Sequence, residues 1–217
     1  MCIENRIYAM ERQAELSRDD YAQLEKWVDT QDDYIRDLIA SLLVNFPTNK
    51  SLNILCSLTQ DNDSLVRADA FDSLSEFPCS ESFKILFDAM FSESDDISRF
   101  CAIRSCAEVI LLLGRNSEDV KSVFGDIYRR DPSDLCKLAS CYGMFLFGED
   151  NALALILAFL GHPDYHIRCS TISVFREILD DNNKQVLKEA VMQLKKYEQS
   201  EAVISSIDEF LIFAENN

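Results

Sequence analysis

The sequence predicts an all-α fold: a right-handed α-solenoid of about six antiparallel helix pairs. Three observations predict it: a motif that recurs along the chain, an apolar helical stripe after each copy, and a shortage of turn residues. The 217 residues include only 5 Gly and 4 Pro, too few for the many turns of a β-sandwich. Because a repeat array grows by adding units that pack on their neighbours, we expect residues 1–217 to form one repeat domain.

The recurring motif is five residues long, with a capping residue first and a basic residue last. The basic position is occupied by Arg36, Arg67, Arg99, Lys137 and Arg168, with a weak last copy ending at Ser205. Successive copies are 31, 32, 38, 31 and 37 residues apart. The first motif residues are Asp32, Asp63, Asp95, Ser133 and Asp164. Asp and Ser are preferred helix N-cap residues, so each copy predicts the start of a helix.

An apolar stripe at helical spacing follows each motif. Counted from the basic residue, we expect the core at offsets −1, +3, +7 and +10, which in the first copy are Ile35, Ile39, Leu43 and Phe46. Spacings of three and four residues place these side chains on one helix face. A second apolar stretch, such as 51–58 or 82–90, precedes each later motif. Each repeat is therefore predicted to hold a helix A and a motif-bearing helix B, and the sequence has room for thirteen helices.

The pattern Asp-x-x-Val-Arg-x-x-Ala-x-x-x-Leu of residues 63–74 resembles the B helix of HEAT repeats. Residues 160–168 resemble that family's turn into helix B, and the resemblance covers residues 20–213. The repeat is shorter than the roughly 40–47 residues of long HEAT units, as in the compact bacterial version. HEAT-like arrays present a concave surface lined by B helices to a partner. The resemblance therefore implies a non-enzymatic protein–protein interaction scaffold, with another protein as its partner and no catalytic residues.

The net charge of −17, from 38 acidic and 21 basic residues, limits the class of partner. Such a surface repels a phosphate backbone, so we expect no nucleic-acid partner. It attracts a basic protein, although acidity can also serve solubility alone. One alternative is a bacterial immunity-type protein that neutralises a basic toxin. Another is a HEAT-like enzyme, because relatives of that fold include bilin lyases and alkylpurine DNA glycosylases. The glycosylase needs a basic concave face, which the charge opposes.

The eight cysteines could form disulfides in an oxidising compartment or remain thiols in a reducing one. Residues 1–6 carry charges without an apolar signal core, and the apolar stretch 152–160 is too short to cross a bilayer. We therefore predict a cytoplasmic protein without a membrane partner, whose thiols are free and mostly buried.

Metal and cofactor chemistry finds little support in the residue spacing. His162 and His166 are four apart, as in zinc-binding helices, but Pro163 places a helix start between them, so turn and cap roles are favoured. The pairs 101/106 and 136/141 are cysteines five residues apart, which point about 140° apart on a helix and cannot share a metal. Residues 61–63 begin like a calcium loop but lack its glycine. We predict no cofactor and no metal.

The predicted binding surface lies on the B helices, opposite the core, at offsets +1, +5 and +8 from the basic residue. These offsets select the candidate partner-binding residues Asp37, Asp72, Phe100, Arg104, Leu138, Tyr142 and Phe145. Exposed aromatic and aliphatic side chains would form an interaction patch. The alternative is that they belong to the core, because a slip of one residue in the repeat register would bury them.

Overall fold

The computed structural model describes residues 2–115 and 118–217. These residues form thirteen α-helices, two short 3-10 helices and no β-strand, which confirms the predicted all-α solenoid class. The chain divides into two compact units, Met1–Asn116 and Ser117–Asn217. That residues 1–217 act as a single repeat domain stays a prediction.

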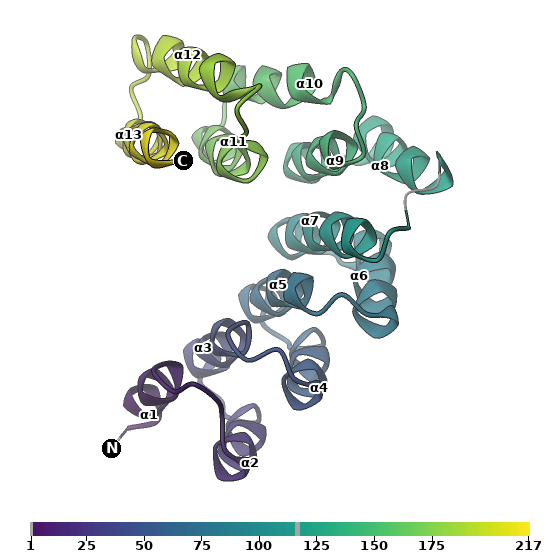
Figure 1. Ribbon diagram of the computed structural model, residues 1–217, viewed down its shortest axis with the longest axis vertical. Helices are drawn as coiled ribbons and strands as arrows, with labels where there is room; N and C mark the ends of the chain where they lie inside the picture. Colours follow the sequence, from purple (N-terminus) through teal and green to yellow (C-terminus); the bar gives the residue numbers. More distant parts are fainter. Residues whose placement is uncertain (1, 116–117) are drawn as a thin grey trace. The chain divides into compact units, whose positions relative to one another are not determined.

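The first unit contains seven α-helices in two rows (Figure 1). Helices α1, α3, α5 and α7 lie side by side in one row, and α2, α4 and α6 form the other. The three motif-bearing B helices are α3, α5 and α7. The bounds are α1 Ile3–Glu11, α2 Arg18–Trp27, α3 Asp33–Leu43, α4 Asn49–Leu58, α5 Ser64–Ser73 with the 3-10 helix η1 Leu74–Glu76, α6 Ser80–Ser92 and α7 Asp96–Leu112.

The second unit repeats this arrangement with its own rows. Helices α9, α11 and α13 form the motif row, and α8, α10 and α12 pack on it (Figure 1). The bounds are α8 Glu118–Arg130, α9 Asp134–Leu146, α10 Ala152–Ala158 with the 3-10 helix η2 Phe159–Gly161, α11 Tyr165–Ile178, α12 Lys184–Lys195 and α13 Glu201–Asn216. None of the helices in the described part of the chain combines the length and apolar character needed to cross a bilayer.

The apolar stripe occupies the core as predicted. All residues at offsets −1, +3, +7 and +10 are buried in the first, second and fifth copies: Ile35, Ile39, Leu43, Phe46, Val66, Ala70, Leu74, Phe77, Ile167, Thr171, Phe175 and Ile178. The same offsets are buried in α7 and α9, where the motif is degenerate. The repeat register is therefore continuous through both units.

The motif's first residue begins its helix in every one of these copies. Asp63 Oδ1 accepts hydrogen bonds from the backbone N–H groups of Leu65 and Val66, at 2.8 and 3.2 Å. Asp95, Asp164 and Ser133 also cap their helices through the side chain. Asp32 occupies the N-cap position of α3 without a side-chain cap bond, which corrects the prediction there. Its neighbour Asp33 accepts the N–H of Tyr34 instead, at 3.0 Å.

All eight cysteines are free thiols. Burial raises the pKa of Cys106 to about 12 and that of Cys141 to about 12, so these side chains stay protonated and act as small buried apolar groups. Cys136 is buried with them, while Cys101 is half-buried.

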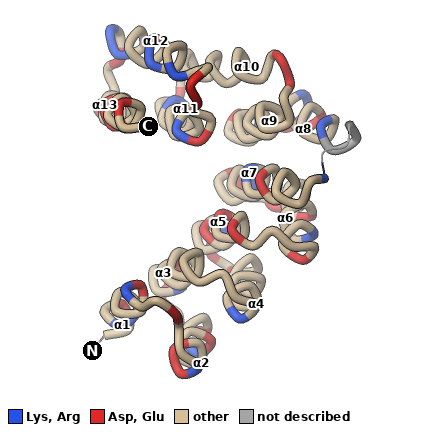
Figure 2. The backbone as a smooth tube through the Cα atoms, in the orientation of Figure 1, with Lys and Arg blue, Asp and Glu red and all other residues tan. Residues whose placement is uncertain are grey.

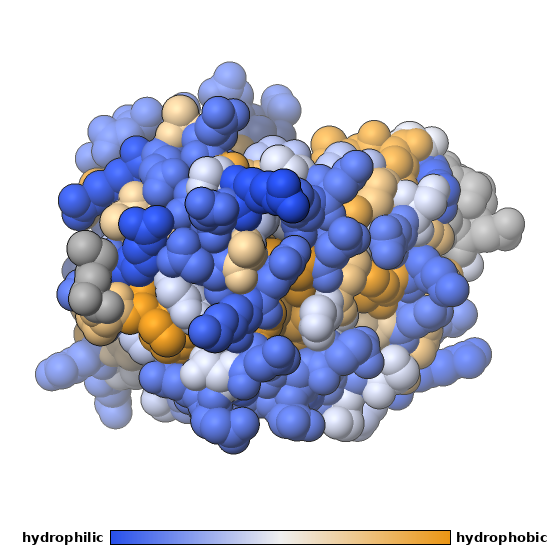
Figure 3. Space-filling view, turned by 90° about the horizontal axis from the view of Figure 1, so that it is seen from below, coloured by the Kyte–Doolittle hydropathy of each residue, from blue (hydrophilic) through white to orange (hydrophobic). Residues whose placement is uncertain are grey.

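Charge and hydropathy are distributed unevenly on the surface. Acidic residues occur on helices and turns of both units (Figure 2), in keeping with the net charge of −17. Hydrophilic side chains cover most of the face shown in Figure 3, and apolar side chains are exposed between them.

Candidate functional site

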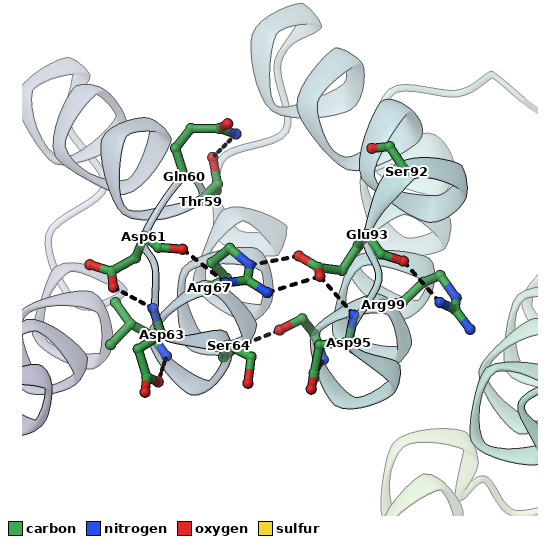
Figure 4. Close-up of polar contacts among 12 residues, drawn as sticks. Thr59, Gln60, Asp61, Asp63, Ser64, Arg67, Ser92, Glu93, Asp95 and Arg99 are labelled. Atoms are coloured by element: carbon green, nitrogen blue, oxygen red, sulfur yellow. Dashed lines mark hydrogen bonds and ion pairs between the residues drawn. The ribbon is translucent and has the colours of Figure 1, made fainter.

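In three motifs the basic residue makes a structural contact between repeats: Arg36, Arg67 and Arg168. Arg67 on α5 donates from Nε and Nη2 to both carboxylate oxygens of Glu93, at 2.7 and 2.9 Å (Figure 4). Its Nη1 donates to the backbone carbonyls of Asp61 and Asn62, at 2.8 and 3.2 Å. Glu93 Oε1 also accepts the N–H of the next cap residue, Asp95, at 2.8 Å. We call this arrangement the arginine clasp; it ties one B helix to the turn before the next.

The clasp recurs in both units. Arg36 holds Asp61 through two hydrogen bonds of 2.6 and 2.9 Å. Arg168 holds Glu198 through two of 2.8 Å. Burial raises the pKa of Asp61, but the hydrogen bonds from Arg36 and from the backbone of Asp63, together with the charges of Arg36 and Arg67, leave the pKa below its usual value. Sequence reasoning missed these carboxylates, although a signal existed: each lies two residues before an N-cap. The guanidinium groups of the clasped arginines already hydrogen-bond these carboxylates and are therefore not free to bind a ligand.

His162 replaces the clasp carboxylate in the turn before α11. Its Nδ1 accepts the N–H of Asp164 at 3.1 Å, which places the ring proton on Nε2. That nitrogen lies 3.1 Å from Asp134 Oδ2 and donates to it. His166 contacts Asp164 Oδ1 at 2.9 Å. Both histidines thus have the turn and cap roles that the sequence favoured, and the described residues include no group of three or more His, Cys, Asp or Glu placed to hold a metal.

The exposed stripe of the B helices is rotated from the one predicted. On α5 it follows offsets −2, +2 and +5, where Leu65 and Asp72 are exposed and Asp69 is half-buried. At about 100° per residue this stripe lies about 60° around the helix from the predicted one. Offset +1 faces the neighbouring helix of the row instead, and so Ala68 and Phe100 are buried.

The predicted apolar patch is therefore wrong for most of its members. Phe100, Leu138 and Tyr142 are buried, with exposed fractions of 8, 0 and 4%. Phe145 is half-buried. Arg104 is half-buried and lies over the Phe100 ring, 5.2 Å from its centroid. Asp37 and Asp72 remain accessible, and a role of Asp72 in partner binding stays a prediction.

Asp37 meets a second carboxyl group across the helix row. Asp37 on α3 forms a carboxyl–carboxyl hydrogen bond with Asp69 on α5, and Ser41 Oγ donates to Asp69 Oδ2 at 3.2 Å. Burial, the hydrogen bond to Asp69 and the charges of Asp69, Asp63 and Asp33 raise the pKa of Asp37 to about 7. The carboxyl group of Asp37 therefore gains or loses its proton near neutral pH, as expected for a carboxyl group beside other negative charges.

An open cavity gives access to Asp37. It has a volume of about 200 Å³ and is lined by Asp33, Tyr34, Asp37, Asp63, Leu65 and Val66. Tyr34 Oη lies 3.1 Å from Tyr8 Oη on α1. This hydrogen bond raises the pKa of Tyr34 to about 12, so the Tyr34 hydroxyl group stays protonated near neutral pH. A larger cavity of about 500 Å³ lies over the Arg67 clasp, but its Arg67, Asp61 and Glu93 are held in clasps.

The cavity and the Asp37–Asp69 pair form the candidate site. A carboxyl group with a pKa near 7 can take up or release a proton at neutral pH, which is the property required of a general acid or base. Sequence reasoning selected Asp37 as a binding residue only and did not select Asp69.

No family model matches the chain, and no curated protein matches it in sequence. Solved structures do match it. One is a chain of the complex of CpcE and CpcF of phycocyanin lyase from Nostoc sp. PCC7120, with a TM-score of 0.59, 12% identity, and coverage of 98% of this chain and 95% of that one. Another is human deoxyhypusine hydroxylase in complex with glycerol, with a TM-score of 0.50, 12% identity, and coverage of 99 and 90%. The chain therefore has a HEAT-like helical solenoid fold.

These structures correct the functional expectation. The similar chains belong to a lyase and a hydroxylase, so the prediction of a non-enzymatic scaffold is wrong. The alternative of a HEAT-like enzyme fits the findings better.

Proposed function

We propose that this chain is an enzyme of the lyase class, of the bilin-lyase kind, in which the Asp37–Asp69 pair transfers the proton. The observation that carries the proposal is the raised pKa of Asp37, about 7, beside a cavity open to a substrate. The similarity to a phycocyanin lyase chain over 98% of this chain and 95% of that one supports the choice of reaction class. The proposal places the chain among compact HEAT repeat proteins of a reducing cytoplasm.

A lyase reaction needs one group that serves as base and acid in turn. In the elimination direction, ionised Asp37 takes a proton from the carbon next to the bond that breaks. The C–H electron pair forms the new double bond, and the leaving group departs with the electron pair of its own bond. In the addition direction, the electron pair of the nucleophile forms the new bond to one carbon of the double bond, and the π electron pair takes the proton from protonated Asp37 at the other carbon. A pKa near the working pH serves both directions.

Asp69 and the two tyrosines have positioning roles in this proposal. Asp69 hydrogen-bonds Asp37 and helps to raise its pKa, while Ser41 fixes Asp69 from α3. Tyr34 lines one side of the site, and its hydroxyl group hydrogen-bonds that of Tyr8. The Tyr34 hydroxyl group can orient a polar substrate atom without competing for the proton.

The experiment is a pigment-transfer assay with phycocyanin, the protein named in the similar lyase. The purified chain is incubated with phycocyanin alone, and also with CpcE or CpcF as the second chain. We expect pigment to leave phycocyanin with the wild-type chain, and the rate to fall by about 100-fold or more in Asp37→Asn. The matched control is Glu25→Gln, which changes an exposed carboxylate on α2 and should keep the wild-type rate. Unchanged pigment content under all three conditions would refute the proposal.

A further inference from the structure

Three exposed apolar side chains form a ridge on the first unit. They are Tyr34, Leu65 and Ile97, each the second residue of its helix, on α3, α5 and α7. Their exposed fractions are 49, 56 and 49%. Because each occupies motif offset −2, the repeat places them in line along the row. We call these three residues the apolar ridge.

The ridge is held in position by contacts between neighbouring helices. The Arg36 and Arg67 clasps fix the turns that lead into α5 and α7. Ser98 Oγ on α7 donates to the backbone carbonyl of Ser64 on α5. Tyr34 is held from α1 by the hydrogen bond with Tyr8, at 3.1 Å. A surface fixed in this way loses little conformational entropy when a partner binds.

Carboxylates flank the ridge, whereas nearby arginines turn away from it. Asp33 and Asp63 line the cavity between Tyr34 and Leu65, and Asp95 caps the helix that carries Ile97. The motif arginines are held in clasps or by backbone carbonyls: Arg99 Nη1 donates to the carbonyl of Glu93 at 2.8 Å. An apolar line between acidic side chains matches a partner whose apolar side chains alternate with basic ones.

We propose that the apolar ridge binds a basic, extended segment of a protein substrate. Neighbouring helices lie roughly 8–10 Å apart. An extended chain in the polyproline II conformation has three residues per turn and rises about 3.1 Å per residue, so every third side chain lies on the same face. One apolar side chain at every third position would therefore meet one ridge residue each, with lysine or arginine between. The cavity of about 200 Å³ is smaller than small-molecule sites of roughly 300–1,000 Å³, but suits one long side chain. The inference rests on the proposed function in one respect only: it calls the protein that carries the bound segment a substrate.

The test is direct binding of a synthetic peptide, Lys-Leu-Lys-Lys-Leu-Lys-Lys-Leu-Lys, labelled at its N-terminus and followed by fluorescence anisotropy. We expect saturable binding to the full chain and none for the same peptide with Glu in place of Lys. The double variant Leu65→Ser, Ile97→Ser should weaken binding by about tenfold or more. The matched control is Phe91→Ser on α6, which removes an apolar side chain that is 61% exposed and lies outside the ridge; it should bind as the wild type does.

Several results would overturn the inference. They are the absence of saturable binding, equal binding of the Lys and Glu peptides, or wild-type affinity in the ridge variant. The single variant Leu65→Lys, which keeps the aliphatic stem but adds a repelling charge, gives a second measurement and should also weaken binding. The ridge variants are read out by peptide binding, whereas Asp37→Asn is read out by the pigment assay. Peptide binding and the pigment assay can therefore fail separately.

Discussion

Asp37 carries the proposed chemistry because its surroundings keep its carboxyl group from ionising. Burial removes water from the charged form, and Asp69 adds a hydrogen bond and a like charge. Burial and the contact with Asp69 both favour the protonated form of the Asp37 carboxyl group. The clasp carboxylates show the opposite case: Glu93 receives two hydrogen bonds from Arg67 and its pKa is lowered despite burial. A half-buried carboxyl group in this fold thus has a lowered pKa where an arginine hydrogen-bonds it, as at Glu93, and a raised pKa where another carboxyl group does, as at Asp37.

The raised pKa predicts a specific dependence of stability on pH. The pKa of Asp37 rises from 3.8 to about 7 on folding, so the folded chain binds this proton more tightly. The resulting stabilisation is complete below pH 3.8 and is lost as the pH rises through 7. We therefore expect Asp37→Asn to be more stable than the wild type at pH 8 by about 1 kcal/mol, allowing for solvent screening, or about 2–4 °C in Tm. The gain should vanish at pH 4, which calorimetry at both pH values can check; Asp72→Asn should show no such trend.

Only half of this site could be predicted from the sequence. Asp37 was identified because its offset from Arg36 places it on the accessible side of α3. Asp69 was missed, since its offset of +2 lay outside the predicted exposed stripe. The difference of about 60° arises from how neighbouring B helices rotate against one another. Spacing within one helix fixes which residues share a face, but it does not fix which neighbour that face meets.

At the scale of the elements, the caps and stripes follow directly from the sequence. Asp63 caps α5 and the stripe from Val66 to Phe77 is buried, because both depend on local hydrogen bonds and helical spacing. The arginine clasp joins residues 25–30 positions apart, and it became visible only once the turns were placed. Local signals therefore predicted the helices, whereas the link between repeats required the structure.

The clasp should contribute measurably to the cohesion between α5 and α7. Glu93→Gln keeps the shape of the side chain but removes the negative charge that holds Arg67. The Glu93 side chain is only 7% exposed. We expect a loss of about 1–3 kcal/mol in the free energy of unfolding by urea, the range for a buried charged hydrogen bond. The control Glu25→Gln changes an exposed residue on α2 and should cost little. Equal effects of the two changes would show that the clasp adds nothing to stability.

At the scale of the whole molecule, stability should be distributed along the helix rows. In a repeat array each helix pair contacts only its neighbours. A substitution that destabilises one helix should therefore destabilise the helices packed against it and leave distant helices unchanged. Phe210 on α13 is fully buried and packs against Phe175 on α11, with ring centroids 5.8 Å apart. This contact lies entirely within the second unit.

Phe210→Ala tests this view of the molecule. Removing a buried aromatic ring leaves a cavity and costs about 3–5 kcal/mol, because the neighbouring Phe175 ring loses its packing partner. We expect hydrogen exchange to accelerate in α11, α12 and α13, while the amides of α1, α3 and α5 exchange as in the wild type. Exchange measured by mass spectrometry resolves these segments. The control Ile212→Ala truncates a side chain on α13 that is 63% exposed and should leave all segments unchanged. If Phe210→Ala accelerated exchange equally in α1 and α13, the chain would unfold as one cooperative body, and the nearest-neighbour account of its stability would be wrong.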